Sequence, residues 1–206
     1  MRLVGHPRRR RRSHGQALVE FALVIPVFLT VFFAIVEFSF LFTDYVSIGY
    51  ASHDAAQLAA TMGNTLHADT AILLRVNNDI QTPANNRQIK TVDIFQVDTN
   101  TTNGSAVSGR ENIYTYDGGS HPFTMPDGTT IQLPFTYTTL GYVDVGRCNV
   151  NLGIGCTTYG QTTVDTIGVK ISYQYTWVTP FPAMIGGSGN GPLITELNIM
   201  RLEPVL

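Results

Sequence analysis

The feature that most constrains this chain is an apolar stretch near its N-terminus, preceded by five consecutive arginines, Arg8 to Arg12. Within Ala17–Phe42 the only charged residues are Glu20 and Glu37. As a helix, Ala17–Val36 would be about 30 Å long, which matches the hydrocarbon core of a bilayer. We therefore predict a single-pass membrane helix, with its arginine-rich N-terminus in the cytoplasm and the C-terminal part of the chain outside.

The junction between the basic leader and the apolar stretch differs from that of a secretory signal. A signal peptide is cut after its hydrophobic region, at small residues. Here the small residue, Gly15, stands before the apolar stretch and is followed by Gln16. Cleavage between them would remove residues 1–15 and leave the helix attached. Glu20 is the second unusual feature, because a carboxylate inside the membrane is costly and a plain anchor avoids it.

These residues carry a resemblance to a known family. The run Gly15-Gln-Ala-Leu-Val-Glu-Phe-Ala-Leu-Val-Ile-Pro26 resembles the start of the TadE/TadG-like pseudopilins of tight-adherence (Flp-type) pili. Glu37-Phe38, the alanine-rich Ala55–Ala60 and, loosely, the C-terminal Leu197–Glu203 are also similar to that family. The resemblance implies cleavage of the Gly15–Gln16 bond by a prepilin peptidase. It also implies that Glu20 pairs with the N-terminal amine of a neighbouring subunit and helps to set the register of assembling helices.

Other residues of the helix leave alternatives open. Glu37, near the opposite membrane interface, is either a solvated acid at a helix end or a second pairing site in assembly. Pro26 removes one backbone hydrogen bond and predicts a kink or local melting. The helix is expected to continue to Met62, with Gly63 as its stop. Small residues along this continuation either admit a second helix or pack on the chain's own domain: Gly49, Ala51, Ala55, Ala56, Ala59 and Ala60.

The remainder of the chain predicts an α+β domain. Asp69–Ile80 has the apolar spacing of a short amphipathic helix, and strands follow at Val92–Val97, Asn112–Tyr116 and in the run Thr129–Val145. Ile167–Trp177 alternates apolar and polar residues, as a half-buried strand does. The final strand is expected over Ile194–Leu202, and turns are expected at Asn103-Gly104, Asp117-Gly118 and Asp127-Gly128. We expect a pilin-like fold in which an antiparallel sheet packs on the long helix, with a leader at 1–15, the helix at 16–62 and an extracytoplasmic domain at 63–206.

The two cysteines, Cys148 and Cys156, both fall in the part expected to lie outside. An oxidising compartment and a short glycine-containing loop favour a disulfide between them. A redox or metal pair is the alternative, but the spacing suits neither.

Charge and motifs restrict the function. Six of the thirteen lysines and arginines lie in the leader and all fifteen acids follow it, so the processed chain is acidic. This argues against a nucleic-acid partner, which would need a basic surface. We find no catalytic motif, so no enzyme and no cofactor are predicted. Asp98-x-Asn100 begins like a calcium loop but lacks the glycine and glutamate that should follow.

We therefore expect a minor pseudopilin in the cytoplasmic membrane, a structural component of a tight-adherence pilus or its secretion system. Its partners would be the membrane, a prepilin peptidase, other pilins and pseudopilins, and the secretion machinery. The alternative is a membrane-tethered module that binds a carbohydrate or surface partner through Tyr173, Tyr175 and Trp177. These aromatic residues would otherwise belong to the core of the sheet.

Overall fold

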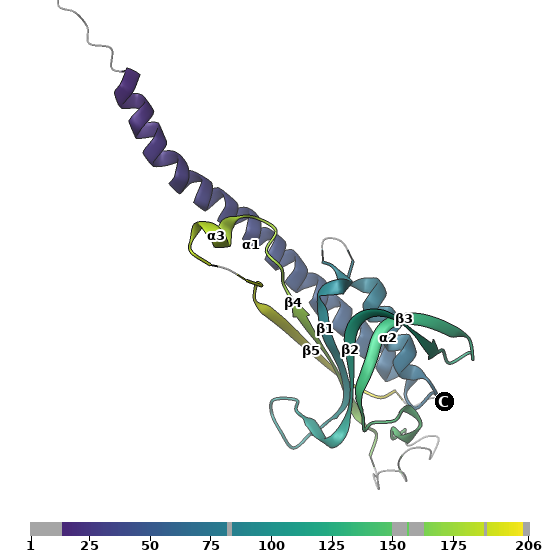
Figure 1. Cartoon of the computed structure of the whole chain (residues 1–206). Coiled ribbons are helices and arrows are strands. Elements are labelled where there is room, and N and C mark those ends of the chain that lie inside the picture. The colour runs from purple at the N-terminus through teal and green to yellow at the C-terminus, as the bar shows by residue number, and fades with distance from the viewer. Residues whose placement is uncertain (1–13, 82–83, 150–155, 157–162, 188, 204–206) are drawn as a thin grey trace, which may run out of the picture.

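The dominant element is one long helix, α1, His14–Met62 (Figure 1). The computed structural model describes residues 14–81, 84–149, 156, 163–187 and 189–203, so most of the leader lies outside the described residues. α1 ends where Gly63 adopts a left-handed conformation (φ 55°) and donates its N–H to the carbonyl of Ala59 at 3.1 Å. The single helix predicted up to Met62 is confirmed. The backbone stays helical through Pro26, so the proline does not melt it.

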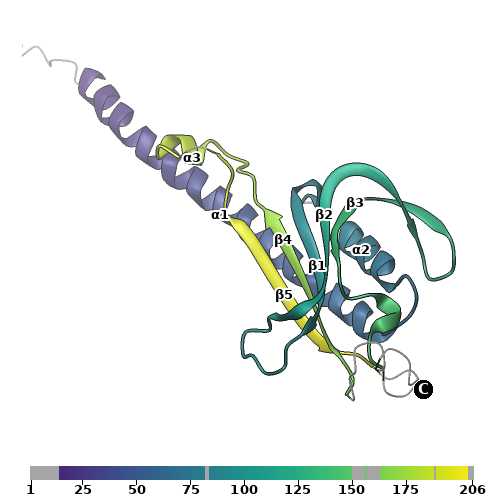
Figure 2. The same cartoon turned by 60° about the horizontal axis from the view of Figure 1, so that its bottom comes forward.

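A five-stranded antiparallel sheet follows, in the order β3-β2-β1-β4-β5. Among the described residues there are also two shorter helices and two 3₁₀ turns. Helices α1 and α2 cover the same face of the sheet (Figure 2). The α+β fold class is confirmed. The elements are α2 (Ala68–Asp79), a turn at Asn86–Gln88, β1 (Ile89–Val97), β2 (Ala106–Thr124), β3 (Thr130–Leu140), a turn at Asp144–Gly146, β4 (Thr166–Gln174), α3 (Phe181–Met184) and β5 (Leu193–Arg201).

The core lies between α1 and the sheet. The alternating apolar residues of β4 point toward the helices and are buried, as the sequence pattern predicted: Ile167, Val169, Ile171 and Tyr173. On α1, the alanines at 51, 55, 56, 59 and 60 are buried against the same sheet and α2. The small residues of this part of α1 therefore pack on the chain's own domain. A helix from another subunit, the alternative that the sequence left open, is therefore not needed to cover these alanines.

Two local predictions were wrong. Asp117-Gly118 does not reverse the chain. Instead β2 continues, and its register with β3 shifts between Tyr116 and His121. Asp117 is used within that bulge, where its Oδ1 accepts a hydrogen bond from Gly119 N at 2.8 Å. β4 ends at Gln174 rather than Trp177, because its partner β5 begins opposite that residue, at Leu193.

The disulfide between Cys148 and Cys156 is present. Cys148 is buried and its backbone is hydrogen-bonded to Asp165, just before β4, whereas residues 150–155 of the closed loop lie outside the described residues. Closing a loop of this length stabilises a fold by about 2–3 kcal/mol in the chain-entropy description.

Candidate functional site

The N-terminal part of α1 protrudes from the domain (Figure 1), and its large apolar side chains are mostly exposed. No side chain from Gly15 to Val36 is buried, and Leu18 and Leu23 are 68% and 71% exposed. This segment is about 33 Å long at the helical rise, close to the thickness of a bilayer core. α1 is the one helix in the described part of the chain that is long and apolar enough to cross a membrane. In aqueous solution this large apolar surface would be exposed to water, which is unfavourable. We therefore expect a membrane or other helices to cover it.

Glu20 is the acid within this exposed segment. Its Oε1 accepts a hydrogen bond from Nε2 of Gln16, one helical turn earlier, at 3.1 Å. Gly15 and Gln16 are themselves helical and exposed. The junction and the acid therefore lie together at the start of α1, in contact with no other element. A group from another molecule can approach both of them directly.

Glu37 is placed quite differently, because it is the first buried residue of α1, with 1% of its surface exposed. Its Oε1 accepts hydrogen bonds from the Tyr175 hydroxyl at 2.6 Å and from Val178 N at 3.0 Å. Its Oε2 accepts from Thr179 N at 2.7 Å and from the Thr179 hydroxyl. Glu37 is thus not a solvated helix-end acid. Within the chain, it fastens the segment after β4 to the point where α1 leaves the domain.

The aromatic residues of the alternative binding surface do not form one. Tyr173 and Tyr175 are 0% and 1% exposed, and only Trp177 is partly accessible. The Tyr173 hydroxyl donates to Oδ2 of Asp44 at 3.1 Å, as Tyr175 does to Glu37. Both tyrosines therefore anchor the sheet to α1 and belong to the core.

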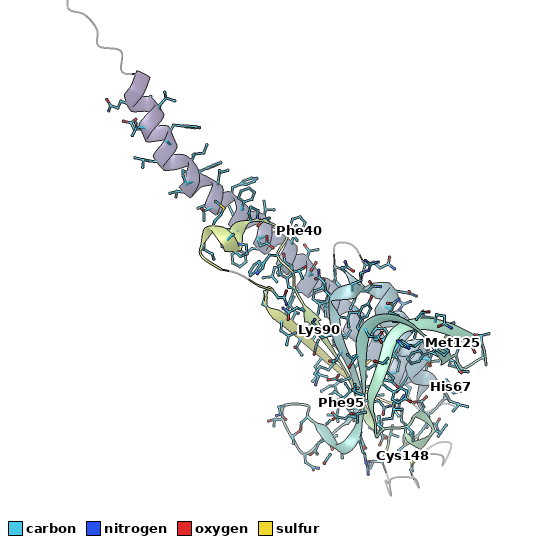
Figure 3. The ribbon with its side chains drawn as sticks, viewed as in Figure 1. Phe40, His67, Lys90, Phe95, Met125 and Cys148 are labelled. Carbon is cyan, nitrogen blue, oxygen red and sulfur yellow. A yellow bond between two sulfur atoms is a disulfide. The ribbon has the colours of Figure 1, made fainter. Side chains whose placement is uncertain are left out.

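A second polar cluster, which the sequence did not indicate, lies near the other end of the sheet domain. The Arg147 guanidinium is fully buried, forms a close ion pair with Asp69 and lies 3.5 Å from an Asp144 oxygen. Oδ2 of Asp69 also accepts hydrogen bonds from Asn112 Nδ2 at 2.7 Å and from the Tyr114 hydroxyl at 2.8 Å. Figure 3 shows this end of the domain, around His67 and Cys148, well away from α3. The cluster joins α2, β2 and the turn before Cys148.

A cleft of about 960 Å³ opens beside this cluster, between α2 and the curled end of the β2–β3 hairpin. Its walls are mostly apolar, and Asp69, Tyr114 and Asp144 reach it from the polar cluster. Among the described residues, no group of three or more His, Cys, Asp or Glu side chains is arranged to hold a metal ion. The exposed apolar residues along the cleft are Leu66, Tyr137, Leu140, Val143 and Val145.

Asp144 makes the stability of this cluster depend on pH. Burial, together with the nearby Asp69 carboxylate, raises the pKa of Asp144 to about 6. Since the folded-state pKa lies above the ordinary aspartate value, the contribution of Asp144 to stability is complete at about pH 4 and is lost as pH rises through about 6. We expect Asp144→Asn to raise the free energy of unfolding in urea at pH 7 by about 1–3 kcal/mol over the native chain. This advantage should shrink at pH 4, and a pH-independent difference would contradict the assignment.

Comparison with known proteins finds a match for the N-terminal segment. Residues 15–57 match the family model described as TadE-like protein. This range includes Gly15, Gln16, Glu20 and Glu37 and ends within the part of α1 that packs on the sheet. No curated protein and no solved structure matches the chain.

Proposed function

We propose that this TadE-like chain is a minor pseudopilin, a structural component in the assembly of a tight-adherence (Flp-type) pilus or its secretion system. The observation that carries the proposal is the exposed apolar segment Gly15–Val36, which contains one acid, Glu20, and lies within the range that matches the family. The segment is inserted in the cytoplasmic membrane, with the sheet domain on the extracytoplasmic side. The role is structural rather than enzymatic.

A prepilin peptidase cleaves the chain, which then assembles with other pilins or pseudopilins. Cleavage after Gly15 places a new amine on Gln16, which is cationic near neutral pH. That amine and the Glu20 carboxylate stand on the same exposed turn of α1. Two such helices side by side, displaced along their axes, bring the amine of one chain to the acid of the other. Desolvation of the two charges offsets much of the attraction between them, so the pair adds little to the stability of the assembly. Its role is instead to select the register of the two helices.

The processed N-terminus is the direct test. Protein extracted from membranes of cells with the pilus system should begin at Gln16, and its intact mass should lack residues 1–15. Gly15→Val should retain the leader while folding normally, because a Cβ at Gly15 meets nothing within 4 Å. The measurement is intact-mass spectrometry with N-terminal sequencing. A native chain that keeps Met1, or that begins beyond Phe42, would remove the proposed route.

A further inference from the structure

The α3 loop, defined here as Trp177–Ile185, is the part of the sheet domain closest to the protruding half of α1 (Figures 1 and 2). Its Phe181 ring lies 6.4 Å from that of Phe38, centroid to centroid. Its backbone donates two of the hydrogen bonds that hold Glu37. Because Glu37 is the first buried residue of α1, the loop begins where the uncovered apolar helix ends.

The composition of this region is unusual for a surface. No Asp, Glu, Lys, Arg or His occurs between Lys170 and Glu196. Three apolar side chains of the loop are nevertheless exposed, Val178 at 63%, Ile185 at 60% and Met184 at 39%. On α1, Phe38, which packs against Phe181, and Phe42 are also exposed, at 62% and 69%. Single exposed apolar residues are ordinary, but several of them on neighbouring segments that carry no charged residue mark a contact surface.

The position of the loop along α1 indicates what it contacts. Gly15–Val36 alone spans about 33 Å, against about 30 Å for the hydrocarbon core. A bilayer that covers this segment therefore reaches its outer interface at Glu37, level with the loop. At that depth an exposed carboxylate would meet lipid, but the loop itself covers Glu37 with hydrogen bonds. The chain's one tryptophan, Trp177, also stands here, and tryptophan favours this interface.

We propose that the α3 loop rests in the headgroup region of the extracytoplasmic leaflet, with Val178, Met184 and Ile185 in contact with acyl chains. The contact fixes the depth and tilt of the sheet domain while the subunit is in the membrane. It relies on insertion of α1, which the proposed function also requires. The loop would leave the lipid when the subunit moves into an assembly.

Trp177 serves as its own probe, since no other tryptophan is present. The full chain is reconstituted in phosphatidylcholine–phosphatidylglycerol vesicles, with or without phosphatidylcholine brominated near the headgroup end of its acyl chains. We expect the brominated lipid to reduce Trp177 emission by about twofold, as for a ring at the interface, while aqueous iodide has little effect. Flotation of the protein with the vesicles after a carbonate wash reports insertion of α1 independently.

A matched control moves the probe away from the loop. Tyr50 is 74% exposed on α1, about 20 Å beyond Glu37, so Tyr50→Trp in a Trp177→Phe background should be quenched by iodide and not by brominated lipid. Ile185→Glu should weaken lipid quenching of Trp177, because it places a charge in the contact. Val145→Glu, at a site that is 45% exposed in the distant cleft, should leave it unchanged.

The outcomes separate the two proposals. Failure of the protein to float would overturn membrane insertion and with it the proposed function. Insertion with Trp177 open to iodide would overturn the loop contact alone. Equal lipid quenching at positions 50 and 177 would also overturn it, because the domain would then lie on its side. Lipid quenching confined to Trp177 and reduced by Ile185→Glu supports the proposal.

Discussion

Glu20→Ala is expected to abolish incorporation of this subunit into the pilus apparatus while leaving membrane insertion intact. The variant removes one partner of the proposed pair with the Gln16 amine of a neighbouring chain. Truncating one partner of a buried, hydrogen-bonded charge pair typically costs about 2–5 kcal/mol, mostly because the other charge is left unpaired. That corresponds to a loss of affinity of roughly thirtyfold or more at each contact. Insertion should even become easier, since the apolar segment loses its acid.

The measurement is surface piliation, together with copurification of the subunit with its partners. Glu20→Gln is the matched variant, because it keeps the side-chain length and a polar contact with Gln16 but removes the charge. If the amine–carboxylate pair sets the register, the glutamine variant should be nearly as defective as the alanine variant. Normal piliation with Glu20→Gln would show that a hydrogen bond suffices, and normal piliation with Glu20→Ala would refute the pairing. Intact-mass analysis of each variant tests whether residues 1–15 are absent, as the proposed cleavage after Gly15 requires.

The separation of the two acids along α1 gives Glu20 and Glu37 different tasks. Glu20 is exposed and available to another chain, whereas all four hydrogen bonds described at Glu37 come from the chain's own segment after β4. If α1 packs among the helices of other subunits, as proposed, the hydrogen bonds at Glu37 hold the sheet domain at a fixed position along α1. We infer that Glu37 supplies this fixed point and leaves Glu20 to select the partner.

The features that the sequence predicted are those governed by near neighbours. The long helix, the buried face of α2 and the alternation of β4 follow from periodicity and from the stop at Gly63. The turn at Asp127-Gly128 follows from local backbone preference, with φ 84° at Gly128. Asp117-Gly118 carries the same local signal but lies in a bulge, because the pairing of β2 with β3 resumes beyond it at His121. A dipeptide alone does not distinguish these two outcomes.

The contacts that the sequence could not predict join residues far apart in the chain. Glu37 and Thr179 are separated by 142 positions, and Asp69 and Arg147 by 78. Neither pair has a characteristic spacing, and each acid alone resembles an ordinary surface carboxylate. The partners meet only in the fold, where the end of β4 lies beside α1 and where α2 lies beside the turn before Cys148. For this reason the sequence alone left two interpretations of Glu37, a solvated acid at a helix end or a second pairing site in assembly.

Arg147→Met is expected to lower the free energy of unfolding by about 3–5 kcal/mol, the usual cost of breaking a buried ion pair by removing one partner. The guanidinium is 0% exposed, and its loss leaves Asp69 without its counter-charge inside the domain. The planar group also lies over the Tyr142 ring, 4.9 Å from its centroid, so the variant loses that packing too. Urea unfolding of the full chain in detergent micelles, followed by Trp177 fluorescence, measures the change.

The double variant Arg147→Met with Asp69→Asn distinguishes an unpaired charge from lost packing. Arg147 Nε and Nη1 have no hydrogen-bond partner in the described part of the chain, so the native pair carries an uncompensated desolvation cost. The amide oxygen that Asp69→Asn introduces could still accept the hydrogen bonds that Asn112 and Tyr114 now donate to the carboxylate. We therefore expect the second change to restore at least half of the stability lost in Arg147→Met. A double variant less stable than the single one would show that packing around Arg147, rather than the unpaired Asp69 charge, sets the cost.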